Sequence, residues 1–299
     1  MTTPEGIARA VPDSEGGREP GISLARGGSL GFISGLAIGA AAGLIGVGGG
    51  EFRIPVLLRV LRLPVKVAAG ANTVIGLFVV VLSVTRRWGQ QRLTRDDLTL
   101  GAIMAVASIF GATIGARQAH RLSTPFLKRV VGLYLLAVGV WMVVEGLSHS
   151  EPTLPEPSGW LRWAVAALVG LLIAIASGAL GVAGGEMRIP ALMYLFAVPV
   201  KAAGTVSLIA SIPTVAAGAL AYRRLGHIPN RVLLLAVIMG AGSLVGVVIG
   251  ASLLPWIDPH AIKALLGGLL LVATASLTLP GLFERARAPR PSGEGPLEE

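Results

Sequence analysis

Apolar residues run through this chain in long stretches that are almost free of charge, and short polar or proline-containing segments separate them. Most of these stretches approach or exceed the roughly 20 residues with which an α-helix spans a bilayer. The pattern therefore predicts a helical protein that crosses a membrane several times. The stretches are Val67–Thr85, Leu98–Ala116, Val130–Val144, Trp163–Gly185, Ala202–Tyr222, Val232–Ile257 and Ala264–Phe283.

One motif occurs twice within this pattern, as GVGGGEFRIP at residues 46–55 and as GVAGGEMRIP at residues 181–190. After one deletion, AAGANT (68–73) also aligns with AAGTVS (202–207). The two halves of the chain are therefore predicted to have arisen by duplication. Other landmarks keep the offset of the motif: Pro64 and Pro199, Lys66 and Lys201, Gly111 and Gly246, Gly115 and Gly250, Lys128 and Lys263, Gly132 and Gly267.

Each half follows the same plan. A long apolar segment (Leu30–Val47 or Trp160–Val182) leads into the glycines, and an apolar piece of about ten residues follows, too short to span a bilayer. Three ordinary spans complete the half. We interpret the first two pieces as a helical hairpin broken at the glycines, and such irregular backbone is tolerated only where protein or a water-filled cavity covers it. The hairpins either re-enter, which leaves six spans and two hairpins, or cross fully, which makes ten helices.

With either number of crossings, each half crosses the membrane an odd number of times, so the second half is inverted relative to the first. The fold class predicted is an all-α polytopic membrane protein of two inverted-topology repeats, each a broken helical hairpin plus three transmembrane helices. The expected divisions are a disordered cytoplasmic tail (1–28), the first repeat (29–147), a linker (148–159), the second repeat (160–283) and a C-terminal tail (284–299).

Composition and charge agree with this class. Hydrophobic residues make up 53% of the chain and charged residues 14%, with a mean hydropathy of +0.75, whereas soluble domains are about a quarter charged. The net charge of +9 comes from basic residues at span ends, which indicates topology rather than nucleic-acid binding. Placing both termini in the cytoplasm puts most of these residues inside, so we expect a multi-pass protein of the cytoplasmic (inner) membrane. Arg86, Arg87, Arg223 and Arg224 are interpreted as such topology determinants.

The charged residues of the two motifs are the main candidates for a site. Glu51, Arg53, Glu186 and Arg188 lie at the breaks, and a charge deep in a bilayer costs at least about 2.5–3.5 kcal/mol, so such residues usually mark a pathway. Two guanidinium groups predict an anionic substrate. Glu51 and Glu186 are expected to orient the arginines or to carry protons. The alternative is a purely structural clamp, in which Glu51 pairs with Arg188 and Glu186 with Arg53.

The backbone of the breaks should contribute to the same site. Pro55 and Pro190 are assigned as helix-break residues in the first turn of a half-helix, whose free N–H groups would then point at the substrate. The remaining substrate-binding candidates are Gly49, Gly50, Gly184, Gly185, Asn72, Thr73, Thr205 and Ser207. For the last four, hydrogen bonds between helices or back to their own helix are an equal alternative.

Several other classes find no support in the sequence. The chain has no cysteine, and its four histidines fall in expected loops without metal-ligand spacing, so no metal, cofactor or catalytic residue is expected. GVGGGE lacks the ending of a nucleotide-binding loop, which argues against ATP-driven transport. An anion channel, a carrier of a non-sulfur carboxylate and a membrane receptor stay open as alternatives.

At both motifs the sequence resembles the TauE/SafE sulfite exporter family, also called the TSUP transporters. The matching stretches include GLIGVGGGEFRIPVLL, GALGVAGGEMRIPAL, GATIGARQAHRLS and GVVIGASLLPWID, and the resemblance runs from about Leu30 to Leu279. It implies a secondary transporter of sulfite, sulfonates or related anions in the cytoplasmic membrane, driven by the proton gradient. Family members commonly have apolar residues between the glycines and the proline, whereas this chain has Glu-Phe-Arg and Glu-Met-Arg.

The expected function is therefore secondary active transport of a small sulfur-containing anion, coupled to protons, by alternating access between two repeats. The expected partners are the anion, protons, the lipid bilayer and a second copy of the chain in a homodimer. No nucleic-acid partner is expected, and the chain is not expected to be an enzyme.

Overall fold

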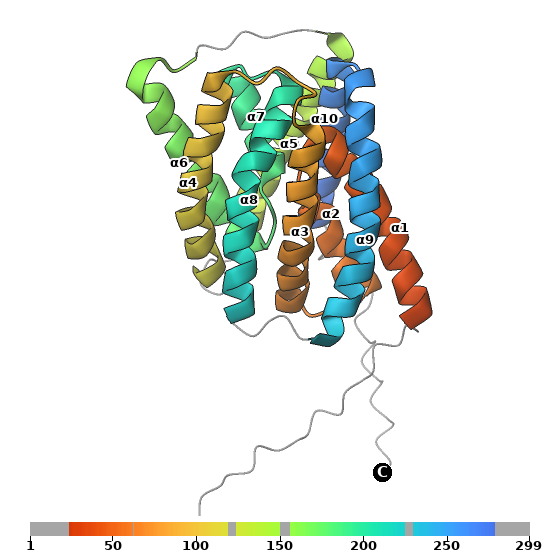
Figure 1. Ribbon diagram of the computed structural model, residues 1–299. Coiled ribbons are helices and arrows are strands. Elements are labelled where there is room, and N and C mark those ends of the chain that lie inside the picture. Colours follow the sequence, from red (N-terminus) through yellow and green to blue (C-terminus); the bar gives the residue numbers. More distant parts are fainter. Residues whose placement is uncertain (1–23, 62, 119–123, 150–155, 225–229, 279–299) are drawn as a thin grey trace, which may run out of the picture.

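The computed structural model describes residues 24–61, 63–118, 124–149, 156–224 and 230–278. In this part of the chain the secondary structure is helical throughout, without a strand (Figure 1). The expected tail 1–28 lies outside the described residues up to residue 23, as do half of the linker (150–155) and all of the C-terminal tail. Helix α1 begins at Leu24, within the segment expected as a tail.

The helices of the first half are α1 (Leu24–Ile45), α2 (Gly50–Pro55), the π-helix η1 (Val56–Val60), α3 (Val65–Arg87), α4 (Arg95–Gln118) and α5 (Thr124–Ser148). Those of the second half are α6 (Gly159–Leu180), α7 (Gly185–Phe196), α8 (Val200–Arg224), α9 (Asn230–Leu253), the 3₁₀-helix η2 (Leu254–Trp256) and α10 (Pro259–Thr278). Each half thus has a helix, a break, a short helical piece and three further helices, as the sequence predicts.

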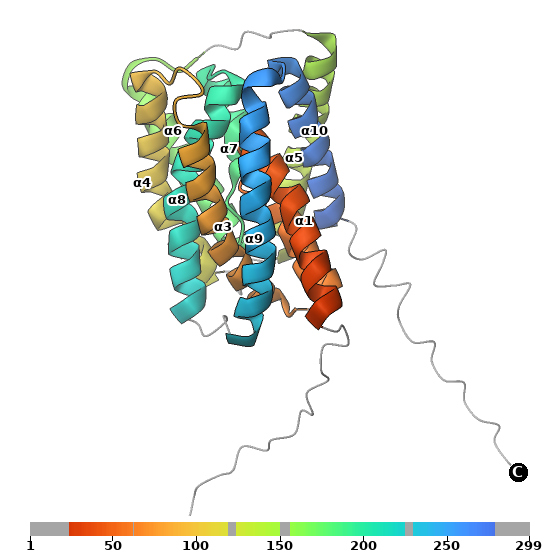
Figure 2. The ribbon, with the colours of Figure 1, turned by 45° about the vertical axis from the view of Figure 1, so that its right-hand side comes forward.

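The pairing of the helices is the same when the two halves are exchanged. Helix α1 packs on α9 as α6 packs on α4, and α3 packs on α9 as α8 packs on α4. Helices α3 and α8 contact each other across the middle, as do α5 and α10 at one side (Figure 2). In Figure 1, α1 starts at the lower end of the bundle and α6 at the upper end.

Glycines bring the most closely paired helices together. A Cβ atom added at Gly111 of α4 would lie 2.6 Å from the carbonyl oxygen of Leu171 in α6. Its counterpart in the duplication, Gly246 of α9, meets the carbonyl oxygen of Leu36 in α1 in the same way. Without a hydrophobic driving force between helices in lipid, such close backbone packing is a main source of their association.

Seven helices in the described part of the chain are long and apolar enough to cross a membrane. Large apolar side chains cover their outer surface, as Phe110, Leu133 and Val237 illustrate, and in a bilayer these face the hydrocarbon. Helices α2 and α7 are too short to span and lie inside the bundle. A surface groove of about 430 Å³ beside α4 is lined only by apolar side chains, so it offers nothing to a polar ligand: Ala102, Ile103, Val106, Ala107, Phe110 and Ala167.

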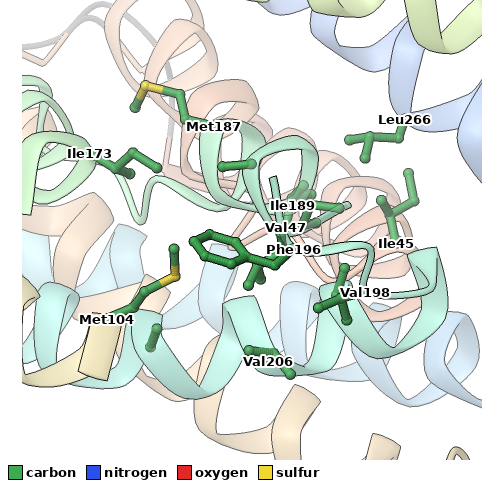
Figure 3. Packing of buried hydrophobic residues seen from close by; sticks show 14 of the residues in the cluster. Ile45, Val47, Met104, Ile173, Met187, Ile189, Phe196, Val198, Val206 and Leu266 are labelled. Carbon is green, nitrogen blue, oxygen red and sulfur yellow. The ribbon is translucent and has the colours of Figure 1, made fainter. Parts of the chain in front are cut away.

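The largest apolar cluster surrounds α7 and holds the second break in place. Figure 3 shows Phe196 at the end of α7 between Met104 of α4 and Val206 of α8, with Ile189 and Val47 nearby. Met104, Val206 and Ile189 are fully buried. Helix α7 is thus fixed by packing on the neighbouring helices, which keeps the charged residues at its start in a defined position.

Candidate functional site

The two breaks contact each other in the middle of the bundle. They comprise residues 46–49 and 181–184, which connect α1 to α2 and α6 to α7. A Cβ atom at Gly185 would lie 3.0 Å from the Cα atom of Val47, and one at Gly50 would lie 3.4 Å from the Cα atom of Val182. The glycines therefore allow one break to pack directly on the other, and the two motifs form one site.

The short helices begin at the glycines rather than at the prolines. Gly49 and Gly184 have positive φ angles of 69° and 76° and act as N-caps, a backbone conformation that costs a glycine little. Pro55 is the last residue of α2, and Pro190 lies inside α7, which continues to Phe196. The expectation that both prolines occupy the first turn is therefore wrong. A proline at these positions removes one helical hydrogen bond, and the chain follows Pro55 with the π-helix η1.

Arg53 is fully buried and connects α2 to α3. Its Nε donates to Oδ1 of Asn72 at 3.0 Å, and its Nη2 donates to the carbonyl oxygen of Gly48 at 2.5 Å. Asn72 in turn donates to the carbonyl oxygen of Gly181 at 2.7 Å. The first motif is thus tied to the second break through one amide side chain.

Arg188 is also fully buried, against a row of polar groups on α8. Its Nη1 donates to Oγ of Ser211 at 2.7 Å and to the carbonyl oxygen of Ser207 at 3.1 Å. Its Nη2 lies 3.4 Å from Oγ of Ser108 in α4 and 3.5 Å from Oγ1 of Thr214. These contacts are the counterpart of those that Arg53 makes with α3.

Three buried donor groups in the site lack a hydrogen-bond partner among the described residues. They are Nη1 of Arg53, Nε of Arg188 and Oγ of Ser207. Buried donors are normally paired in proteins, and each unpaired one costs about 1–3 kcal/mol. Two guanidinium N–H donors and one hydroxyl are therefore free to bind an acceptor that enters the site.

The two glutamates lie near each other and, within the described chain, form no ion pair with the arginines. The carboxyl groups of Glu51 and Glu186 lie near each other, and both oxygens of Glu51 and Oε2 of Glu186 are buried without a hydrogen-bond partner among the described residues. No ion pair joins Glu51 to Arg188 or Glu186 to Arg53, and the described residues contain only the pairs Glu156–Arg162 and Glu145–Lys263. The clamp considered as an alternative is therefore not formed by these described residues. Two neighbouring carboxyl groups can share one proton, because two like charges side by side disfavour the ionisation of both.

The other polar candidates are placed differently. Thr73 donates to the carbonyl oxygen of Gly70 in its own helix at 2.8 Å, which is the alternative considered for it. Thr205 accepts a hydrogen bond from Nε of Arg87 at 3.0 Å and donates to Gln91 at 2.8 Å. Of the four polar candidates, Asn72 lies beside Arg53 and Ser207 lies beside Arg188.

Arg87 is the clearest departure from the sequence interpretation. It is buried instead of exposed at a membrane interface. Its guanidinium group donates to the carbonyl oxygens of Gly43 and Leu44 at 2.9 and 2.8 Å and to that of Lys201 at 2.8 Å. These bonds satisfy carbonyl groups at the end of α1, just before the first break, which a helix cannot pair internally.

Sequence reasoning missed Ser108, Ser211 and Thr214 as partners of Arg188. Ser207, Ser211 and Thr214 repeat at spacings of four and three along α8, and this spacing puts them on one helix face. This polar helix face could have been recognised in the sequence as a binding surface for a buried charged group. Ser108 stands alone on α4, and nothing in its neighbourhood points to Arg188. No group of three or more His, Cys, Asp or Glu residues in the described chain could hold a metal ion.

Comparison with known proteins identifies the family of this chain. The family model described as "Sulfite exporter TauE/SafE" matches residues 27–292. The probable membrane transporter proteins YjnA and YunE of Bacillus subtilis are 23% and 24% identical, over 82% and 84% of this chain and 98% and 97% of their own. The probable membrane transporter protein MJ0441 of Methanocaldococcus jannaschii is 27% identical over 63% of this chain and 69% of its own. No solved structure matches. The chain therefore belongs to the TauE/SafE family of multi-pass membrane transporters.

Proposed function

We propose that this protein is a secondary active carrier of a small sulfur-containing anion such as sulfite or a sulfonate, coupled to protons and working by alternating access across the cytoplasmic membrane. The observation that carries the proposal is the pair of fully buried arginines, each with an unpartnered N–H group, where the two breaks meet. The name of the family points to sulfite.

The arginines support an anionic substrate. A guanidinium group presents several N–H donors in a fixed plane, which suits the oxygens of sulfite, sulfonate or carboxylate groups. In Arg53 and Arg188 part of each guanidinium group is held by the protein, and one nitrogen of each is left without an acceptor. A bound oxyanion would pair with these donors and remove the cost of burying them unpaired.

The glutamates support coupling to protons. With both carboxyl groups ionised, Glu51 and Glu186 balance the charges of Arg53 and Arg188, and an added anion would leave an excess negative charge in the bilayer. One proton on the glutamate pair leaves one excess positive charge, which a monoanion neutralises. Because uncompensated charge is costly at this depth, anion binding and protonation favour each other.

The arrangement of the helices supports alternating access. Inverted repeats with broken helices at the midplane are a recurring plan of secondary transporters. Here the helix pairing is unchanged when the halves are exchanged, and α1 and α6 start at opposite ends of the bundle (Figure 1). We assign the two halves as inverted repeats, with both termini in the cytoplasm as the distribution of basic residues suggests.

The proposal is tested by the thermal stability of the purified protein against sulfite, sulfate, thiosulfate, a sulfonate and acetate. A ligand that binds only the folded state raises the melting temperature by mass action. We expect at least one sulfur oxyanion to stabilise the wild type but neither Arg53→Ala nor Arg188→Ala, whereas Arg86→Ala, at an exposed helix end, responds as the wild type does. If no anion raises the melting temperature of the wild type, the site is ruled out. It is also ruled out if an anion raises the melting temperatures of the arginine variants as much as that of the wild type. A carboxylate as the best ligand would change the substrate class.

A further inference from the structure

A second buried charge cluster lies outside the site, between α5, α7 and α10. Nζ of Lys263 in α10 forms an ion pair with Oε1 of Glu145 in α5 at 2.5 Å, and the hydroxyl group of Tyr194 in α7 donates to Oε2 of Glu145 at 2.5 Å. Glu145 and Lys263 are only 4% and 8% exposed. Burying an ion pair is at best weakly stabilising, so its presence among apolar helices calls for a role.

Tight packing of α5 on α10 does not depend on this cluster. A Cβ atom at Gly267 would lie 2.7 Å from the carbonyl oxygen of Gly139, and one at Gly146 would lie 2.7 Å from that of His260. Backbone contacts of this kind already hold two membrane helices together. The charged groups are therefore not needed to hold α5 against α10.

The cluster continues outward to the end of the bundle. His149 lies one helical turn after Glu145, and His260 lies one turn before Lys263. Their ring centroids are 4.6 Å apart, and His149 is exposed. The backbone N–H group of His260 donates to Asp258 at 2.8 Å and lowers the pKa of that carboxyl group. An exposed imidazole ring can accept and donate a proton, so this end can serve as an entrance.

The cluster also continues inward to the site. The hydroxyl group of Tyr134 in α5 donates to the carbonyl oxygen of Met187 at 3.1 Å, and Met187 directly follows Glu186 in α7. Along α5, Tyr134 and Glu145 are about 16 Å apart at 1.5 Å per residue. Helix α5 contacts both α10 and α7.

We propose that the row His149–His260, Lys263–Glu145, Tyr194 and Tyr134 is the route by which protons travel between the α5–α6 end of the bundle and the Glu51–Glu186 pair. It rests on the proposed function, to which it adds the path of the coupling proton. The observation behind it is a series of ionisable groups on α5, α7 and α10, which runs from the exposed His149 through the Tyr194–Glu145–Lys263 cluster to Tyr134, bonded beside Glu186.

The transfer is a relay that leaves each intermediate group as it was. Tyr134 gives its hydroxyl proton to the glutamate pair and regains one from the direction of Tyr194, which is in turn resupplied through Glu145. A water molecule can carry the proton where two groups do not bond directly. The net change is one proton taken from water at the histidines and one added to the Glu51–Glu186 pair.

The route is tested without a transported substrate, by following the infrared band of the protonated glutamate pair after a pH jump in lipid nanodiscs. Glu51→Gln and Glu186→Gln assign the band. Tyr194→Phe keeps the ring and removes the hydroxyl group, and we expect protonation to slow by about 100-fold, as when a positioned proton-transfer group is lost. Tyr222→Phe, at a buried tyrosine in α8 outside the row, is the matched control and should leave the rate unchanged.

The outcomes separate the route from the proposed function. An unchanged rate in Tyr194→Phe and in Glu145→Gln overturns the route and leaves coupling through the pair intact. A wild-type protein without a titrating band overturns the route and the coupling together, while the anion panel still decides the substrate. If Glu145→Gln fails to fold, the protonation rate of Tyr194→Phe is sufficient to accept or reject the route, because that variant keeps the packing of the ring.

Discussion

The side-chain amide of Asn72 donates a hydrogen bond to the carbonyl oxygen of Gly181, at 2.7 Å, and accepts one from Nε of Arg53. One residue of α3 thus positions an arginine of the first motif and holds the backbone of the second break. Because both partners are buried, the two motifs cannot be displaced relative to each other without breaking these bonds. This link is what makes two distant sequence motifs a single site.

Removing the amide of Asn72 should therefore affect both stability and binding. Asn72→Ala leaves a buried carbonyl and a guanidinium N–H unpaired, at an expected cost of about 1–3 kcal/mol, and it frees Arg53 to move, so anion affinity falls as well. Thr73→Ala, which removes a hydroxyl group bonded within its own helix, is the matched control. Thermal unfolding and anion titration of both variants check this, and equal behaviour of the two would contradict the role of Asn72.

Arg87 should prove to be structural where Arg53 and Arg188 bind the anion. Arg87→Met removes the donors that satisfy the end of α1, so we expect a loss of stability of about 3 kcal/mol with anion affinity nearly unchanged. Arg188→Lys should show the reverse, with a folded protein and weak binding. Measuring both the melting temperature and the anion affinity of each variant distinguishes a structural arginine from an anion-binding one. Weak anion binding by folded Arg87→Met would contradict a purely structural role of Arg87.

The packing glycines of the two halves should be equally sensitive. Gly111→Ala and Gly246→Ala place a methyl group against the backbone of α6 and α1, and overpacking of this kind typically costs about 1–3 kcal/mol. Gly268→Ala is the control, because a Cβ atom there meets nothing within 4 Å. Thermal stability in detergent checks the three variants. Tolerance of both substitutions would contradict the close helix packing.

Anion binding should depend on pH through the glutamate pair. The charged and ionisable groups that face the pair are Arg53 from α2, Arg188 from α7 and Tyr134 from α5. If a monoanion binds together with a proton, its affinity falls as the pH rises in the wild type. Glu186→Gln fixes one carboxyl group in a neutral form, so its affinity should change much less with pH. Isothermal titration at several pH values decides this, and parallel profiles would exclude the pair as the proton site.

The sequence predicted the breaks and their charged residues because the duplicated motif marks them directly. It did not predict how these charges pair, since that depends on the rotation of two short helices about their axes. Glu51 and Glu186 lie near each other because Gly50 and Gly185 each pack on the opposite break. The spacing of residues along the sequence does not reveal this contact. Arg87 was misread because an arginine at the end of a span looks the same whether it reaches lipid headgroups or turns inward.

The helical plan of each half could be predicted from apolar stretches and their lengths, and the structure has the same order of elements. The position of the helix starts could not, because Pro55 and Pro190 signal a first turn, whereas glycines with positive φ begin both helices earlier. The row from His149 to Tyr134 also escaped sequence reasoning. Its members come from three helices, and only the packing of α5 on α10 and α7 brings them into line.

The most direct test of the central claim is uptake of sulfite, or of the anion with the largest stabilising effect, into proteoliposomes under an imposed pH gradient. A proton-coupled carrier that binds the anion at Arg53 and Arg188 should accumulate it above the outside concentration and stop when the gradient is collapsed. The Arg53→Ala/Arg188→Ala double variant should show no uptake. Downhill flux that ignores the gradient and survives in the double variant would contradict both the site and the coupling.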